Sequence, residues 1–306
     1  MSGVITGFAV IAAVIATGYV LGRYGVLGDN GREVLTRLAF TVASPALLFE
    51  TLAHADLSVL VSAPLLITAL STFAMAAVHA TVGAVRRWPV GETTVGALCA
   101  SYVNAGNLGI PVAAYVLGDA SLVAPVLLFQ LLLVTPVALT VLDVTTSGGG
   151  GSVLRRVTSP FRNPIVIGSL AGVVVAATGW EVPEPVMEPF HLIGGMSVPA
   201  VLLAFGISLH GSALPLRGDE RGPVLLSVAL KSLGQPAVAW VLGSAVFGLT
   251  GRQLFTVVVT AALPAAQNIF TYASRYGVAT RVARESILLS TMLAVPVLVA
   301  VAALLG

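Results

Sequence analysis

The stretches SYVNAGNLGIP (residues 101–111) and AALPAAQNIF (residues 261–270) each interrupt an apolar segment with proline and side-chain amides. In the hydrocarbon core of a bilayer no water pairs with exposed peptide groups, and each unpaired group costs several kcal/mol. A helix that breaks at this depth therefore has to be surrounded by other parts of the protein or to line a water-filled cavity. The two stretches predict a fold built around a pair of broken membrane-spanning helices.

The composition supports this membrane location. Hydrophobic residues make up 57% of the 306 residues and charged residues only 9%, whereas about 25% of a soluble domain is charged. The fold class is therefore an all-α polytopic membrane protein. The formal net charge of +2 gives no indication of nucleic acid binding. Cys99 is the only cysteine, which excludes an internal disulfide, and we expect it to pack as a small apolar residue.

A membrane-spanning helix needs about 20 predominantly apolar residues. Ten segments of the chain meet this requirement. Their ranges are 3–22, 34–52, 58–84, 93–117, 120–143, 162–179, 187–209, 223–248, 253–275 and 282–305. The first has no basic start, so we interpret it as a retained helix rather than a signal peptide. Apart from Arg252, the basic residues of the connections fall in the odd-numbered ones. The positive-inside rule then predicts a multi-pass protein of the plasma (inner) membrane with both termini outside.

The chain also carries signs of an internal repeat. A linker rich in glycine and serine, residues 145–161, divides the ten segments into the halves 1–144 and 162–306. Three features recur in the same order in both halves: Ser44-Pro45 with Ser197-Val198-Pro199, the two breaks, and Pro136 with Pro296. Because each half has an odd number of spans, the second half has to be inverted. Inverted repeats build alternating-access transporters with the site at the repeat interface. A chance match of prolines is the alternative.

The polar groups of the two breaks form the predicted substrate site. Proline lacks an N–H and suits the first turn of a new half-helix, which has a partial positive charge and N–H groups that favour an anion. The amides beside these ends add neutral donors and acceptors. Alternatively, the amides only pair with the broken backbone. The predicted substrate-binding residues are Asn104, Asn107, Gly109, Pro111, Pro264, Gln267 and Asn268.

Three further residues are candidates for coupling or for carrying charge. Lys231 is the only lysine and lies ~12 Å into the eighth segment. There it could attract an anion, replace a coupling cation or pair with a carboxylate; the alternative is that it extends to the cytoplasmic headgroups. Glu50 is a candidate proton carrier or an interfacial residue. Gln130 either faces the breaks or only bonds between helices.

Other functions find no support in the sequence. It contains no P-loop and no paired-carboxylate, HExxH or GxSxG pattern, so we predict neither ATP hydrolysis nor an enzyme, and no cofactor. Neither break contains a carboxylate, and hard cations prefer charged oxygen ligands, so no metal site is predicted.

The two breaks also carry a family resemblance. The run from Asn104 to Pro111 resembles the N-x-x-x-x-G-I-P crossover of the auxin efflux carrier family, which includes the plant PIN carriers and bacterial permeases. Ala262-Leu263-Pro264, followed by Ala273 and Tyr276, is similar to the family's second crossover. The resemblance covers nearly all ten segments, without the long cytoplasmic loop of the plant carriers. Gln267 and Asn268 depart from the plant pattern, which puts the substrate in question rather than the fold.

The resemblance implies a ten-helix inverted-repeat fold shared with bile-acid sodium symporters and sodium/proton antiporters, and a homodimer. It also implies export or exchange of organic anions such as indole acetate, malate or malonate, with Asn104 and Pro111 at the anion-binding crossover. We therefore expect an elevator-type secondary carrier of a small carboxylate, with the lipid bilayer as its other partner. The alternatives are a sodium-coupled symporter of the bile-acid type and a channel-like or sensory membrane protein.

Overall fold

The computed structural model describes residues 2–54, 62–109, 112–118, 120–146, 164–210, 216 and 220–305. Within these residues the secondary structure is helical, apart from one isolated antiparallel bridge between Val103 and Ala265. Pro111, the side chain of Asn107 and most of the 145–161 linker lie outside the described residues. The predictions made for them, and the division into two halves, therefore stay predictions.

The helices up to the linker are α1 (Ser2–Arg23), α2 (Gly31–Leu38), α3 (Ser44–Ala53), α4 (Ala63–Arg86), α5 (Val90–Ser101), α7 (Ala124–Phe129) and α8 (Thr135–Thr146). Those after it are α10 (Pro164–Thr178), α11 (Glu184–Gly195), α12 (Ser197–Leu209), α13 (Arg221–Ala229), α14 (Gln235–Val241), α15 (Gly251–Ala261), α16 (Asn268–Tyr276) and α17 (Thr280–Leu305). Short π-helical turns join or follow several of them: Ala39–Ala43, Ala105–Gly109, Ala113–Leu117, Gln130–Val134, Leu230–Gly234 and Leu242–Val246. A 3₁₀ turn, Ala120–Val123, precedes α7.

Five helical runs of the described chain are long and apolar enough to cross a bilayer. They are Gly31–Ala53, Ala63–Arg86, Glu184–Leu209, Arg221–Val246 and Thr280–Leu305. These runs coincide with the second, third, seventh, eighth and tenth predicted segments, and they support an all-α membrane protein. The fourth and ninth segments are divided by the breaks, and the count of ten spans stays a prediction.

Among the described residues, three helical runs contain a π-helical turn just before a proline. Pro45, Pro136 and Pro236 each stand two residues after such a turn, and the N–H of the residue before each proline bonds to the carbonyl five residues earlier. Proline cannot donate this bond itself, and its ring clashes with the carbonyl four residues back, so the preceding turn widens. Two of these widened turns contain Gln130 and Lys231, both of which contact the breaks.

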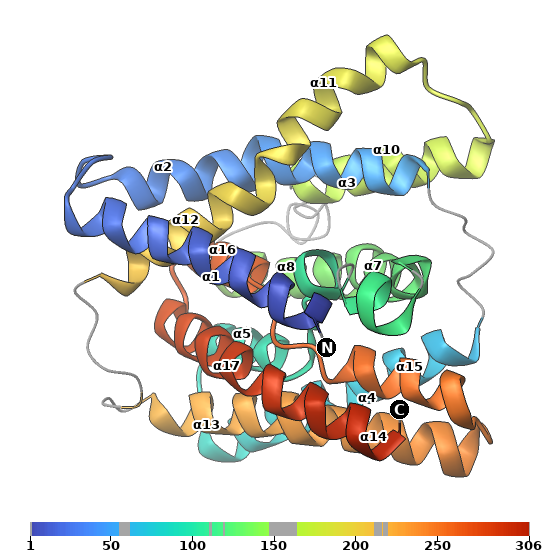
Figure 1. The fold of residues 1–306 in the computed structure, drawn as a ribbon. Coiled ribbons are helices and arrows are strands. Elements are labelled where there is room, and N and C mark those ends of the chain that lie inside the picture. The colour runs from blue at the N-terminus through green and yellow to red at the C-terminus, as the bar shows by residue number, and fades with distance from the viewer. Residues whose placement is uncertain are drawn as a thin grey trace.

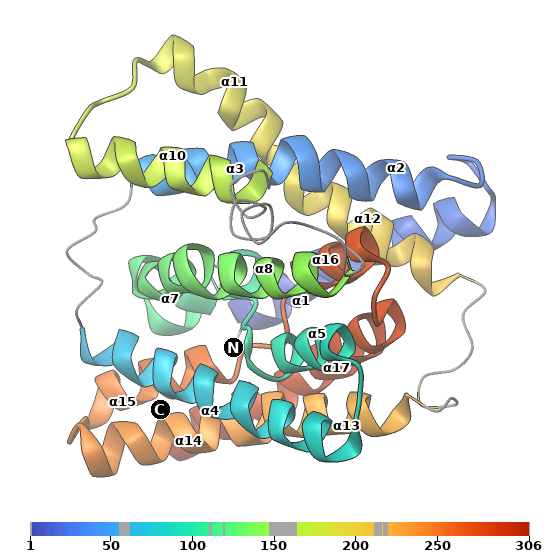
Figure 2. The ribbon, with the colours of Figure 1, turned by 180° about the vertical axis from the view of Figure 1, so that it is seen from behind.

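The helices pack in two groups (Figures 1 and 2). The first, which we call the α12 group, consists of α1, α2, α3, α10, α11 and α12. The second, the α17 group, consists of α4, α5, α13, α14, α15 and α17. Helices α7, α8 and α16 lie between the two groups. The broken segments are therefore placed where the groups face each other.

Glycines let α1 approach α12 closely. A Cβ on Gly206 would fall on the carbonyl oxygen of Ile15, and a Cβ on Gly18 would fall on that of Leu203. Membrane helices associate through small residues in this way because lipid provides no hydrophobic drive for packing. Glycine at these two positions sets the spacing within the α12 group.

We expect Gly206→Ala to destabilise the protein by about 1–3 kcal/mol, because the added methyl group would push the α1 backbone away. Thermal unfolding in detergent would measure this. Gly195→Ala is the matched control, since a Cβ there meets no atom within 4 Å. Equal unfolding temperatures for the two variants would contradict the role of Gly206.

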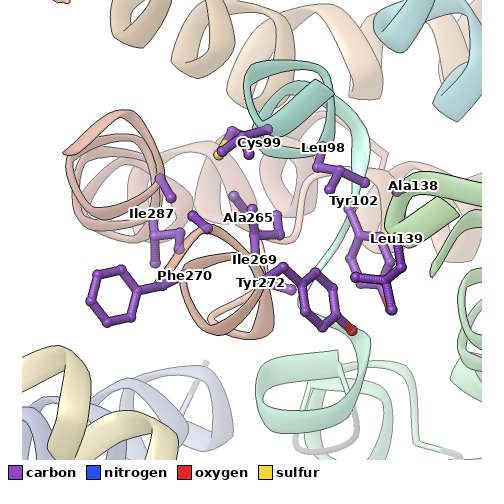
Figure 3. Packing of buried hydrophobic residues seen from close by; sticks show 14 of the residues in the cluster. Leu98, Cys99, Tyr102, Ala138, Leu139, Ala265, Ile269, Phe270, Tyr272 and Ile287 are labelled. Carbon is purple, nitrogen blue, oxygen red and sulfur yellow. The ribbon is translucent and has the colours of Figure 1, made fainter. Parts of the chain in front are cut away.

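A buried apolar cluster surrounds both breaks (Figure 3). Leu98, Cys99 and Tyr102 come from the first broken segment, and they pack with residues of the second. The second segment supplies Ala265, Ala266, Ile269, Phe270, Tyr272 and Ala273. Cys99 is buried and packs as a small apolar side chain, which confirms that prediction. The cluster holds the two breaks together inside protein.

Candidate substrate site at the two helix breaks

The two interrupted segments lie antiparallel and bond to each other through their backbones. The N–H of Asn104 donates to the carbonyl of Pro264 at 2.8 Å, and the N–H of Ala266 donates to that of Tyr102 at 3.3 Å. Peptide groups left without a helical partner at each break are in this way satisfied by the other break. Stretches far apart in the sequence thus form one local structure.

The backbone of each break also bonds to a side chain from another helical segment. Gln130 accepts from the N–H of Val103 at 2.7 Å and donates to its carbonyl at 3.0 Å. The hydroxyl of Ser290, on α17, accepts from the N–H of Ala265 at 3.2 Å. Gln130 therefore faces the break and pairs with its backbone, as a neighbouring strand would.

Two predicted site residues, Asn104 and Gln267, meet across the breaks. Nδ2 of Asn104 donates to Oε1 of Gln267 at 2.6 Å, although the residues are 163 positions apart. Their side chains are 3% and 1% exposed, so the pair is shielded from bulk solvent. A hydrogen bond in such surroundings is stronger than in water.

Asn268, the first residue of α16, is held by two tyrosines. Its Nδ2 donates to Oη of Tyr102 at 3.3 Å and to Oη of Tyr272 at 3.0 Å. Oη of Tyr102 also shares a hydrogen bond with Oγ1 of Thr135, on α8, at 3.0 Å. These tyrosines were not predicted as site residues; the only signal in the sequence was that each lies within four residues of a predicted amide.

A cavity of about 230 Å³ lies beside these amides, between the breaks and the α12 group. Since about 10–15 Å³ measured in this way is enough for one water, the cavity has room for a small solute. It is smaller than the about 300 Å³ at which drug-sized pockets begin. The lining residues of the breaks and of α7, α16 and the π-helical turn after α7 are Tyr102, Val103, Asn104, Ala105, Gly106, Leu127, Gln130, Leu131, Ala266, Gln267, Asn268, Thr271 and Tyr272. Those of α3 and α12 are Ser44, Leu47, Leu48, Thr51, Ser197, Val198 and Val201. All of these side chains are uncharged.

Two serines that correspond in the proposed repeat face each other in this lining. Oγ of Ser44 and Oγ of Ser197 are 2.8 Å apart and share a hydrogen bond. These serines belong to the sequence pattern that predicts a repeat, but they were not predicted as site residues. They add hydroxyl groups to the wall opposite the broken segments.

Gly109 and Pro264 do not line the cavity. Both contribute instead to the conformation and packing of the breaks. A Cβ on Gly109 would lie 2.8 Å from Cγ2 of Val123 and 3.2 Å from Cδ1 of Leu263, closer than packed carbon atoms normally come. Gly109 therefore lets the π-helical turn after the first break pack tightly. Pro264 contributes the carbonyl that accepts from Asn104.

Lys231 is fully buried and does not extend to the headgroups. Its Nζ donates to Oε1 of Gln235 at 2.6 Å and to the carbonyl of Ala261 at 2.8 Å. Nε2 of Gln235 donates to the carbonyl of Ser101 at 2.9 Å and to Oγ1 of Thr72 at 3.3 Å. Ser101 and Ala261 are the last residues of α5 and α15.

The Lys231–Gln235 pair thus caps the carbonyl ends of both half-helices at the points where they break. Helix C-termini have unpaired carbonyls and a partial negative charge, so an ammonium group there is favourable. Gln235 was missed in the sequence analysis; its position four residues after Lys231, on the same helix face, is the signal that could have revealed it.

Glu50 lies on α3, outside the cavity lining. Its Oε1 is 2.8 Å from Nδ1 of His191, on α11, and the Glu50 side chain is 23% exposed. The arrangement fits a residue at a partly accessible edge of the α12 group. The role of Glu50 as a proton carrier stays a prediction.

Comparison with known proteins places this architecture in a family. The family described as "Membrane transport protein" matches residues 4–301. A Rhizobium meliloti (strain 1021) protein named "Putative malonate transporter" is 27% identical, over 92% of this chain and 89% of that protein. An "Uncharacterized transporter" of Methanothermobacter thermautotrophicus is 28% identical, over 84% of this chain and 83% of that protein.

A plant relative matches a shorter region. The Oryza sativa subsp. japonica protein named "Probable auxin efflux carrier component 5c" is 31% identical over 153 residues, which are 47% of this chain and 40% of that protein. The predicted resemblance is thereby confirmed. This chain belongs to the membrane transport protein family of the auxin efflux carriers and is a multi-pass membrane transporter.

Proposed function

We propose that this transporter carries a small organic anion, a carboxylate, which binds in the cavity beside the paired breaks. The observation that supports this best is the lining itself, in which amides and hydroxyls surround a small space and none of the described lining side chains is charged. The name of the Rhizobium meliloti relative also favours a carboxylate. Auxin-like compounds and malonate-like or malate-like acids belong to the proposed class.

The chemistry of the lining suits an anion that has to be released again. The amides of Asn104 and Gln267 and the hydroxyls of Ser44 and Ser197 can donate hydrogen bonds without a formal charge. The N-terminus of α16 adds a partial positive charge near the cavity. Neutral donors hold a carboxylate less tightly than arginine does, because charge-assisted bonds are roughly twice as strong. Such a site releases the bound anion readily, as transport requires.

The mechanism we propose is an elevator-type alternating access in a ten-helix inverted repeat. The α12 group would be the stationary scaffold, and the breaks would move together with the α17 group. The cavity between these two parts supports this division, since a relative displacement of its walls would expose the bound anion. A homodimer, an inner-membrane location and both termini outside accompany the mechanism as predictions.

The coupling we favour does not use sodium. Nζ of Lys231 donates to the carbonyl end of α15 and Nε2 of Gln235 to that of α5, so these two side chains occupy carbonyls that would otherwise attract a cation. The membrane potential, or a proton carried by Glu50, would then drive transport. In the sodium-coupled alternative, a sodium ion at these helix ends would have to compete with Lys231 and Gln235 for the same carbonyls.

A ligand screen followed by a transport assay tests this function. We expect that small mono- or dicarboxylates raise the unfolding temperature of the purified protein. The best ligand should then show saturable counterflow in proteoliposomes that is unaffected by replacing sodium with potassium. A strict sodium requirement would support the symporter alternative, and unsaturable voltage-driven flux would support a channel.

A further inference from the structure

Two serines in the wall opposite the breaks differ from other hydroxyl residues near the cavity. Thr51 and Ser101 each donate to the carbonyl four residues earlier at 2.7 Å, a common partner for a hydroxyl on a helix. Oγ of Ser44 and Oγ of Ser197 instead bond to each other at 2.8 Å. Within the described part of the chain, this is the only hydrogen bond that either hydroxyl makes. The protein therefore does not use all the hydrogens of this pair.

The packing of three helices fixes the pair in the cavity wall. Ser44 is the first residue of α3, after the π-helical turn Ala39–Ala43, and Ser197 is the first residue of α12, just after α11 ends. A Cβ on Gly194 would lie 2.9 Å from Cα and 3.0 Å from N of Leu47, so the end of α11 packs directly on the α3 backbone. Both serines line the cavity, and Ser44 is only half-buried. The close approach of these helices thus places two bonded hydroxyls beside the cavity.

The number of hydrogens in the pair determines what it can bind. A serine hydroxyl has one hydrogen and two lone pairs, so two hydroxyls have two hydrogens. One hydrogen lies in the bond between the two oxygens, whichever serine donates it. The other belongs to the serine that accepts this bond, and a hydroxyl that accepts a hydrogen bond is polarised and donates more strongly. The pair therefore offers one strengthened donor, whichever way the shared bond runs.

We propose that Ser44 and Ser197 jointly donate one hydrogen bond to the carboxylate of the carried anion, and that either serine can supply it. This inference rests on the proposed function and assigns binding residues on the α12 group. A carboxylate only accepts hydrogen bonds, so it matches a pair that has one hydrogen to give. The amide of Asn104 lies in the wall that the breaks form. The anion is then held from both walls, by the two parts that the proposed mechanism moves relative to each other.

A joint donor has a characteristic pattern of substitution effects. In Ser44→Ala or Ser197→Ala, the remaining serine no longer shares a hydrogen with its neighbour and can give its own to the anion. Each single variant should bind the anion at most about threefold more weakly, because only the polarising neighbour is lost. The double variant has neither hydroxyl. Its affinity should fall by at least about tenfold, the effect of one lost bond to a charged group.

The unfolding temperature should show the opposite pattern. The bond between the serines is lost with the first substitution, so each single variant should be destabilised about as much as the double variant. A pair that only joins α3 to α12 would show this pattern in binding as well, with the affinity changing at the first substitution and not at the second. Calorimetry on the purified, detergent-solubilised protein measures the affinities, with malonate, malate, propionate and indole acetate as ligands.

Ser227→Ala combined with Ser244→Ala is the matched control for the double variant. These two hydroxyls donate to the backbone carbonyls of Gly96 and Trp240, and neither serine lines the cavity. The control should bind the acids as the unmodified protein does.

A second double variant keeps the test valid if the first is unstable. Ser44→Ala combined with Ser197→Cys retains a side chain of similar size with only a weak S–H donor, and it should show the same loss of affinity. Unfolding temperatures show which variants keep the fold.

The outcomes separate this inference from the proposed function. Normal affinity when both serines are replaced, or a loss that is already complete in one single variant, would overturn the inference but not carboxylate transport. If none of the four acids binds to the unmodified protein, the proposed function fails together with the inference.

Discussion

Lys231→Met is expected to reduce transport by at least about tenfold and to lower the unfolding temperature by several degrees. The substitution removes the donor to the carbonyl of Ala261 and leaves Oε1 of Gln235 without that partner. Hydrogen bonds to charged groups contribute about 1.5–3 kcal/mol each, and about 1.4 kcal/mol corresponds to a factor of ten. Because the pair caps both half-helices, its loss should disturb both breaks. Counterflow in proteoliposomes and thermal unfolding measure the two effects.

Ser227→Ala is the matched control for Lys231→Met. Ser227 is a buried polar residue one turn earlier, and it donates to the carbonyl of Gly96 rather than to a break. Transport by this control should stay close to that of the unmodified protein. If Lys231→Met retains normal kinetics, the ammonium group has no role in transport. If both variants lose transport equally, any buried polar group in this region is needed, and the capping role is not specific.

Asn104→Ala is expected to weaken binding of the transported carboxylate by about tenfold or more. Its amide lines the cavity and joins the two breaks through Gln267, so the change removes a ligand donor and a link between the segments. A buried hydrogen bond whose partner is lost costs about 1–3 kcal/mol. Calorimetric titration with the best acid of the screen measures the change.

The same substitution at Asn30 provides the control for Asn104. Asn30 precedes α2, is exposed, and makes no side-chain bond to that helix. Asn30→Ala should therefore bind the acid normally. Unchanged affinity in Asn104→Ala would remove this amide from the proposed site, and the substrate would have to contact other groups of the cavity.

Much of the architecture around the site follows from local patterns in the sequence. The prolines and amides of the two stretches indicate breaks, because no regular spanning helix tolerates them there without compensation. The position of Lys231 inside an apolar run indicates a buried charge or one that extends to the headgroups. Sequence alone leaves these alternatives open, since a lysine side chain is long enough for either.

The roles of Gln235, Ser44 and Tyr102, which were not predicted from the sequence, depend on distant partners. Gln235 matters because it bonds to the end of α5 and accepts from Lys231, which bonds to the end of α15, and Ser44 matters because Ser197 faces it. Tyr102 and Tyr272 resemble ordinary core aromatics until their hydroxyls are seen to converge on Asn268. Hydrogen bonds between segments more than 100 residues apart leave no periodic signal in the chain.

The membrane class, the two breaks and the family could all be predicted from the amino-acid order, because apolar runs, prolines and amides act locally along the chain. The tertiary structure alone decided that the breaks bond to each other and that Asn104 meets Gln267. It also decided that Lys231 turns inward to the carbonyl of Ala261. The physical reason is that peptide groups freed by a break in an apolar medium need a partner, and only the packing of the whole chain selects which one.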